Sequence, residues 1–268
     1  FVATAGLIGA AVLLPLGVGL SGRDLSSLHE LLGTEPVCRP ATDADRQPLV
    51  LPLASSGRLV IALPAMVRYQ PGGRAEVVVS GDPSLVGHVR LDGDRLHLDC
   101  NSDRRTSRLT IEVSGPSITD WTLLGSGDLS MTGIDQPELQ LRVRGSGSAT
   151  MTGTAETVDV DVAGSGKASL RNLAARSVRV EIRGSGDVDA DGTAETVEVD
   201  ISGSGKARLR NLVSKSAQLV IRGSGDARVT AQSEADVSIY GSGNVELSGH
   251  PVLRRSEIKG SGRIVQLS

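Results

Sequence analysis

The chain has 268 residues with a net charge of -3, and its basic and acidic side chains are interspersed. It is rich in glycine, with 33, and its only aromatic residues are Phe1, Tyr69, Trp121 and Tyr240. A core must therefore be built from Val, Ile, Leu, Ala and Met. We expect no nucleic-acid partner, because the chain has no basic face for phosphates and too few aromatic side chains on which bases could stack.

Residues 1–20 carry no charge and are long enough to cross a bilayer, since about 20 apolar residues span about 30 Å as a helix. A secretory signal has a shorter apolar stretch and a small-residue cleavage site, which this segment matches poorly. We expect a retained membrane anchor, with a cleaved signal peptide or a buried helix as alternatives. The first two readings make the rest of the chain extracytoplasmic, either membrane-anchored in the periplasm or secreted to the cell surface.

Residues 21–54 predict a short helix and a linker between that segment and the rest of the chain. Four leucines form one helical stripe within 21–33, which ends at a glycine, and four prolines follow in 34–54. Residues 55–268 are then one β-domain.

Cys38 and Cys100 are the only cysteines. In an exported chain two cysteines suggest one disulfide, and the alternative is two unpaired buried thiols. Neither cysteine is expected to be catalytic, because no histidine lies near either one in a nucleophile pattern.

The triplet GSG recurs eight times at intervals of 18 to 20 residues. Its first glycines are Gly125, Gly145, Gly164, Gly184, Gly203, Gly223, Gly241 and Gly260. Apolar and polar residues alternate on both sides of each triplet, which predicts two strands per repeat with one buried face. A single repeat cannot bury that face, whereas stacked repeats can.

This periodicity predicts a parallel β-helix, a solenoid whose turns of about 19–20 residues stack about 4.8 Å apart. The parity of the alternation places both glycines of each triplet on inward positions, where a Cβ would crowd the neighbouring turn. Antiparallel hairpins in a barrel or prism are the rival architecture, but they need tight turns that are mostly missing.

Three carboxylates, Asp161, Glu181 and Asp200, occupy equivalent positions on successive turns. They predict an outward acidic ladder with a spacing of about 5 Å. Such a ladder is either a solvated face, a site for Ca²⁺ or a sugar, or a pair of acids for glycoside chemistry.

A second outward ladder, made of Asp189, Arg208, Arg228 and Glu246, is interpreted as an ion-pair stripe. The GSGKA segments do not match a phosphate-binding loop, because a strand rather than a helix follows them. No serine lies in a nucleophile elbow and the histidines are scattered, so neither catalytic residues, a metal site nor a cofactor is predicted.

The segments VSGDPSLVGHVRLDGDRLHLDC and LTIEVSGPSITDWTLLGSGDLSMTG, followed by the GSG turns, resemble the head GIN domain of putative autotransporter adhesins. The resemblance covers about residues 57–268. It implies a right-handed β-helix-like fold and an extracytoplasmic location in a bacterium, and it carries no established catalytic residues.

We therefore expect a non-enzymatic binding or structural module of the cell envelope, adhesin-like, with surface polysaccharide or another protein as its partner. A carbohydrate-active enzyme is one alternative, which the scarcity of aromatic residues for sugar stacking disfavours. A self-associating scaffold is another, because the last turn, GSGRIVQLS, leaves a strand unpaired.

Overall fold

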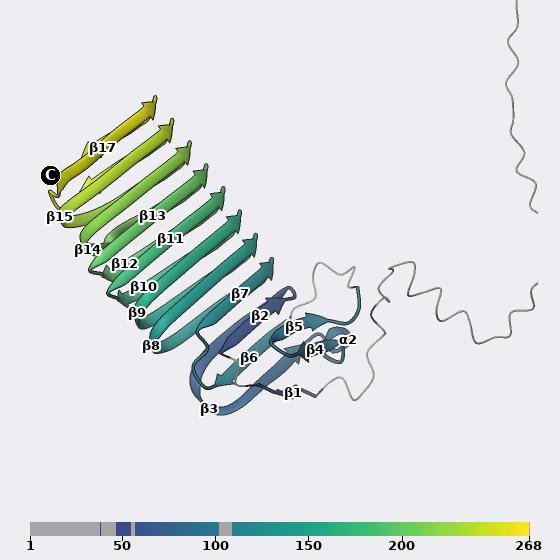
Figure 1. Cartoon of the computed structure of the whole chain (residues 1–268). Coiled ribbons are helices and arrows are strands. Elements are labelled where there is room, and N and C mark those ends of the chain that lie inside the picture. The colour runs from purple at the N-terminus through teal and green to yellow at the C-terminus, as the bar shows by residue number, and fades with distance from the viewer. Residues whose placement is uncertain (1–37, 39–46, 55–56, 102–108, 268) are drawn as a thin grey trace, which may run out of the picture. The chain divides into compact units, whose positions relative to one another are not determined.

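The computed structural model describes residues 38, 47–54, 57–101 and 109–267, all within one compact unit of the chain. They form one hydrogen-bonded sheet of 18 strands, which winds into a β-solenoid of about 8 turns (Figure 1). The all-β fold and its parallel stacking are therefore confirmed.

The segments predicted as an N-terminal hydrophobic helix, 1–20, and as a short helix, 21–33, lie outside the described residues. Within the described part of the chain, no helix is long and apolar enough to cross a membrane.

The elements fall into an N-terminal region and a repeat. The N-terminal region comprises β1 (Leu49–Pro52), β2 (Arg58–Ala62), β3 (Ala65–Gly81), the one-turn helix α2 (Pro83–Val86), β4 (Val89–Asp92), β5 (Arg95–Leu98) and β6 (Leu109–Gly115). The repeat comprises β7 (Asp120–Gly125), β8 (Asp128–Gly145), β9 (Ser148–Gly164), β10 (Lys167–Ala174), β11 (Ser177–Gly184), β12 (Asp187–Thr193), β13 (Thr196–Gly203), β14 (Lys206–Gly223), β15 (Asp226–Gly241), β16 (Asn244–Ser248), β17 (Val252–Gly260) and β18 (Arg263–Gln266).

Equivalent residues of successive turns face each other in parallel register throughout the repeat. Gly125 pairs with Gly145, and Gly145 with Gly164. Two residues earlier, the branched aliphatic side chains of Leu123 and Val143 also pair, and both are fully buried. Stacking of like residues thus builds a continuous aliphatic core, which is what the alternation predicts.

The two glycines of each GSG differ, and the expectation that both point inward was wrong for the first. The second glycine, such as Gly186, is buried, and a Cβ there would lie 2.5 Å from a side-chain carbon of Val162. The first, such as Gly184, is only partly buried and has a φ of +118°. This φ interrupts the alternation at the corner, and a Cβ would point along the stack, 2.7 Å from the carbonyl oxygen of Gly164.

The N-terminal region is less regular, because β3 turns back on itself. Its first half pairs with β6 in rising register, from Ala65 with Leu109 to Gln70 with Ser114. After a bend at Pro71–Gly73 the register falls, from Glu76 with Ser114 onwards, so the second half of β3 runs antiparallel to β6. Strands β4 and β5 form an antiparallel hairpin.

The β-domain begins earlier than its predicted boundary at residue 55. Strand β1 lies within the segment that the prolines mark as linker, and it pairs antiparallel with the second half of β3. Leu49, Leu51 and Leu53 pack on the core, so alternation within the segment outweighs its prolines.

Cys38 and Cys100 form a disulfide. It ties the chain ahead of β1 to the residues after β5, and it closes a loop across a sequence separation of 62 residues. The disulfide expected from the sequence is therefore confirmed, and the alternative of two unpaired thiols is not.

Two aromatic residues close the junction between the N-terminal region and the repeat. The rings of Tyr69 and Trp121 are fully buried, with centroids 4.8 Å apart. The hydroxyl of Tyr69 donates to the carbonyl of Pro116 and accepts from the amide of Ile118. Trp121 Nε1 donates to the carbonyl of Ile118, so both rings hold the loop between β6 and β7.

Candidate functional site

The acidic ladder predicted from the sequence exists as one column of the sheet. Glu181 on β11 pairs in register with Asp161 on β9 and with Asp200 on β13. The three carboxylates therefore lie on adjacent strands of an outward face.

Each of these carboxylates contacts an arginine. Arg183 Nη1 lies 3.0 Å from Asp161, and its Nη2 lies 2.5 Å from Glu181. Arg222 contacts Asp200 at 2.7 Å. The Asp161 carboxylate, and after it Glu181, raises the pKa of the Arg183 guanidinium. A cation would have to compete with these arginines, which favours a solvated ion-paired face.

A fourth carboxylate, Asp159, lies next to this ladder on β9. Burial raises its pKa, Arg179 counters that effect, and the nearby Asp161 adds to it. Asp159 is thus the carboxyl group on this face whose charge is disfavoured by its surroundings.

The second outward ladder is an ion-pair stripe, as predicted. Arg208 contacts Asp189 at 3.3 Å, and Arg228 contacts Glu246 at 2.9 Å. In addition, Arg208 lies 3.1 Å from Asp187. The stripe therefore joins turns by pairs of opposite charge.

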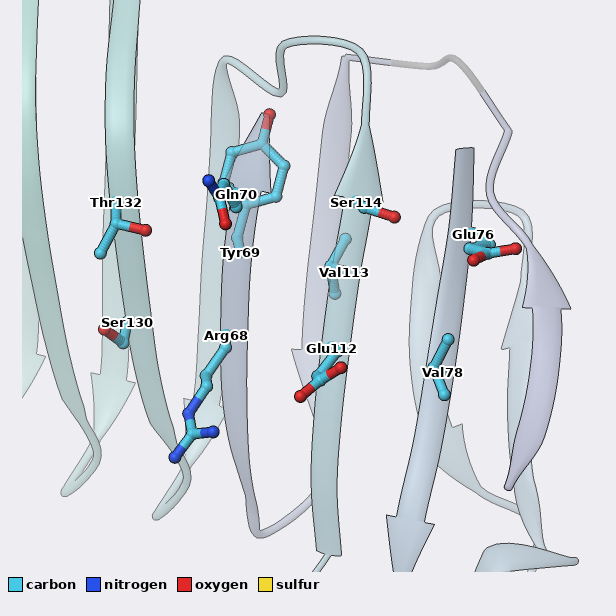
Figure 2. A pocket seen from close by; sticks show the side chains of 10 residues that line it. All are labelled: Arg68, Tyr69, Gln70, Glu76, Val78, Glu112, Val113, Ser114, Ser130 and Thr132. Carbon is cyan, nitrogen blue, oxygen red and sulfur yellow. The ribbon is translucent and has the colours of Figure 1, made fainter. Parts of the chain in front are cut away.

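A hollow of about 370 Å³ lies instead on the N-terminal region, where the sheet passes from β8 through β3 and β6 to the returning half of β3 (Figure 2). Figure 2 shows Ser130 and Thr132 along one side of it and Glu76 and Val78 along the other. We call it the N-terminal hollow. Its lining is formed by Arg68, Tyr69, Gln70, Glu76, Val78, Glu112, Val113, Ser114, Ser130 and Thr132.

The floor of the N-terminal hollow is set by strand register. Arg68 pairs with Ser130 on one side and Glu112 on the other, and Glu112 pairs in turn with Val78. One step along the strands, Gln70 pairs with Ser114. Because residues two apart in a strand share a face, these side chains project to the same outward surface.

The charged groups of the N-terminal hollow are available to a ligand. Arg68 and Glu112 are exposed, and neither forms an ion pair with another described residue. Glu76 has only a 4.0 Å contact with Arg74. The hollow thus offers a guanidinium, an amide, carboxylates and hydroxyls, which together donate and accept hydrogen bonds.

Cys100 belongs to the one group of possible metal ligands found in the described part of the chain, with His88 and Asp99. Its sulfur is in the disulfide and offers no thiolate. His88 and Arg90 both contact the Asp99 carboxylate at 2.7 Å. This group is therefore a salt-bridged cluster rather than a metal centre.

Sequence reasoning missed the N-terminal hollow, because its residues come from segments up to about 60 positions apart. Their contact depends on the return of β3, for which the only visible signal was the turn-forming segment QPGGR at 70–74. Nothing in the alternation alone predicts which strands become neighbours there.

Comparisons with known proteins place the chain in a family. A family model described as "putative auto-transporter adhesin, head GIN domain" matches residues 58–251. No curated protein matches the chain.

Several crystal structures have the same fold. A "putative lipid binding protein" from Parabacteroides distasonis has a TM-score of 0.73 and 20% identity, over 83% of this chain and 97% of that one. A "putative adhesin" from the same organism has a TM-score of 0.74 and 18% identity, over 82% and 96%. A "putative adhesin" from Parabacteroides merdae has a TM-score of 0.76 and 15% identity, over 83% and 96%.

Proposed function

Because the chain belongs to the head GIN domain family of putative auto-transporter adhesins, we propose that it is a non-enzymatic binding module of the cell envelope. In this proposal the N-terminal hollow takes a surface polysaccharide. The observation that carries it is the polar lining of an open sheet face, in which Arg68 and Glu112 form no ion pair with another described residue and Gln70 and Ser114 lie beside them.

The chemistry of the lining favours a saccharide over a lipid. Val78 is the only aliphatic side chain that faces the hollow, since Tyr69 and Val113 are buried with their side chains in the core. Although one similar structure is described as lipid-binding, an acyl chain needs a continuous apolar lining. Hydroxyl groups of a sugar match the donors and acceptors that are present.

The same geometry supports binding rather than hydrolysis. A glycosidase needs a carboxylic acid that is held protonated by an apolar pocket, beside a second carboxylate. Glu112 is exposed and Glu76 has a side chain that is 28% exposed, so water reaches both.

The disulfide between Cys38 and Cys100 supports an extracytoplasmic location. Disulfides persist in oxidising compartments and are rare where thiols are kept reduced. An envelope location also brings the hollow within reach of surface polysaccharides.

The test is co-sedimentation of the full chain with insoluble envelope polysaccharides. The double variant Arg68→Gln/Glu112→Gln keeps the net charge and removes both ionised groups from the hollow. We expect its retention to fall at least about tenfold, because hydrogen bonds to charged groups contribute roughly 1.5–3 kcal/mol each.

The matched control is Arg179→Gln/Glu198→Gln, which removes an exposed ion pair of 2.7 Å from the other face. It should bind as the wild type does. Retention of the hollow variant at the wild-type level, or no retention of the wild type by any polysaccharide, would refute the proposal.

A Ca²⁺-dependent sugar site at the acidic ladder is the alternative that the sequence left open, and its arginine contacts disfavour it. It is tested by adding Ca²⁺ and by the triple variant Asp161→Ala/Glu181→Ala/Asp200→Ala. Because arginines already pair with these carboxylates, we expect neither change to alter retention.

A further inference from the structure

A second hollow, of about 380 Å³, lies on the face formed by β10, β12, β14 and β15. Four arginines line it, Arg171, Arg208, Arg210 and Arg228, and we call them the arginine cluster. The carboxylates in its lining are only Asp189 and Asp191. The hollow itself therefore has two more positive than negative side chains.

Two bulges bring the outer arginines of the cluster together. The register of β10 with β12 shifts between Leu170 and Leu173, and the register of β14 shifts just after Arg208 and Leu209. Each bulge contains the dipeptide Arg-Asn, at 171–172 and at 210–211. The unbulged strand β12 lies between them, so the two Arg-Asn bulges are about 10 Å apart along the stack.

Arg171 and Arg210 have the weakest pairing in the cluster. Arg171 contacts Asp191 at 3.8 Å, and Arg210 forms no ion pair with any described residue. Asp191 itself accepts a hydrogen bond of 2.6 Å from the amide of Asn172. Two guanidiniums thus flank one carboxylate that is already engaged by the backbone.

The other two arginines repel each other, although each has a carboxylate partner. Arg208 and Arg228 pair directly in register, and like charges in that position repel. Their carboxylate partners lie on other strands, Asp187 and Asp189 for Arg208 and Glu246 for Arg228. No carboxylate among the described residues bridges the two arginines, so an anion placed between them would relieve the repulsion.

We propose that the arginine cluster binds phosphate or sulfate ester groups carried by an acidic polysaccharide. Guanidiniums bind such oxyanions through paired N–H donors, and they retain their charge at any physiological pH. The choice of polysaccharide as the carrier rests on the proposed function, whereas recognition of the oxyanion rests on the cluster alone.

A membrane surface is the less suitable source of the same groups. Proteins that bind lipid headgroups usually insert apolar side chains beside the basic ones. The exposed large hydrophobic residues in the described part of the chain are Val50, Met66, Tyr240, Val252 and Ile258, and none of them lines this hollow.

The experiment compares binding of the full chain to dextran sulfate beads and to uncharged dextran beads. The variant Arg171→Gln/Arg210→Gln should lower the apparent affinity for dextran sulfate about tenfold. The control Arg144→Gln/Arg263→Gln removes two exposed arginines outside the cluster, and it should lower the affinity by less than about twofold. Equal losses in the two variants would mean attraction by net charge alone and would overturn the site.

A gain of affinity provides a test that misfolding cannot mimic. The variant Asp191→Asn keeps an oxygen that accepts from the amide of Asn172 and removes the carboxylate that contacts Arg171. We expect it to bind dextran sulfate several-fold more tightly, and inorganic phosphate should compete with the wild type for the beads. No gain and no competition would contradict the proposal.

Two further experiments distinguish this proposal from polysaccharide binding in the N-terminal hollow and from binding to a membrane surface. The hollow variant Arg68→Gln/Glu112→Gln should bind dextran sulfate as the wild type does, even if the wild type does not co-sediment with envelope polysaccharides. Vesicles of phosphatidylglycerol in phosphatidylcholine should not bind in a manner that depends on Arg171 and Arg210. Cluster-dependent vesicle binding without dextran sulfate binding would overturn the polysaccharide assignment.

Discussion

The N-terminal region and the repeat hold one winding sheet together by different means. In the repeat, like residues face like in register, so aliphatic columns fill the core and ion pairs join the turns outside. In the N-terminal region, a disulfide, a strand that turns back and the buried pair Tyr69 and Trp121 take the place of the repeated columns.

This difference indicates where a repetitive fold acquires binding sites. Regular turns present flat faces on which opposite charges pair, as Arg183 does with Asp161 and Glu181. The N-terminal hollow lies where β3 turns back, and the arginine cluster lies where two bulges interrupt the repeat. Where the sheet turns back or bulges, some charged side chains such as Arg68 and Arg210 therefore lack, among the described residues, the ion-pair partner that a regular turn would place beside them.

Removal of the disulfide should have the largest effect and should separate the two regions. In the loop-entropy model, a bond closing about 60 residues contributes about 4 kcal/mol, which Cys38→Ser/Cys100→Ser removes. Because contacts in a solenoid are mostly between neighbouring turns, hydrogen exchange should accelerate in β1 to β6 and change little beyond β9. Equal acceleration throughout would show that the two regions unfold as one.

A methyl group in the glycine stack should cost the next largest amount. Gly184→Ala places a Cβ 2.7 Å from the carbonyl oxygen of Gly164, whereas Gly125→Ala meets nothing within 4 Å. Both positions have positive φ, so the second variant measures the backbone strain alone. Urea unfolding should show Gly184→Ala to be less stable than Gly125→Ala by about 2 kcal/mol. Equal losses would assign the cost to φ rather than to stacking.

Tyr69→Phe should destabilise the junction by about 2 kcal/mol, because it leaves the buried amide of Ile118 without the hydroxyl that it binds. Thermal unfolding followed by near-ultraviolet circular dichroism measures this, since Trp121 packs on the ring. Tyr240→Phe is the control, on a partly exposed ring, and should change stability by less than about 0.5 kcal/mol. A loss as small as the control's would mean that the junction does not depend on this hydroxyl.

The smallest effect is expected at Asp159, and it depends on pH. Burial raises the pKa of Asp159 in the folded chain. Below its ordinary pKa of 3.8 the carboxyl group is protonated in the folded and the unfolded chain, and its contribution to stability is fully present. That contribution is lost as the pH rises through the folded pKa, above which the buried charge destabilises the fold. Asp159→Asn should therefore be more stable than the wild type at neutral pH, by less than about 1 kcal/mol, and no more stable in acid. Asp161→Asn, on the same strand, should instead lose stability because it breaks the pair with Arg183. A loss of stability in Asp159→Asn at neutral pH would contradict this account.

The stack of turns could be predicted from the sequence because a strand has a period of two and a solenoid repeats its register. Alignment of the turns on their GSG triplets therefore predicted that Asp161, Glu181 and Asp200 share a column, which the strand register confirms. The inward position of the first glycine was wrong, because a positive φ changes the direction of the chain at that residue and the alternation carries no information about it.

The partners of long side chains could not be predicted from the spacing. Arg183 reaches back to the preceding turn to contact Asp161, while Arg222 does the same for Asp200. The antiparallel pairing of β1 was hidden for a related reason, since which strand covers an edge depends on packing of distant segments. The N-terminal hollow could not be predicted for both reasons, since it depends on the pairing of distant strands and on the contacts of long side chains.

The most direct test of the account compares polysaccharide retention of two variants side by side, Arg68→Gln/Glu112→Gln in the N-terminal hollow and Asp161→Ala/Glu181→Ala/Asp200→Ala in the acidic ladder. We predict that the first loses retention and that the second keeps it, with or without Ca²⁺, because Arg183 and Arg222 already contact the ladder carboxylates, whereas Arg68 and Glu112 form no ion pair with another described residue. Loss of retention in the ladder variant with full retention in the hollow variant would contradict the central claim that the interrupted part of the sheet carries recognition.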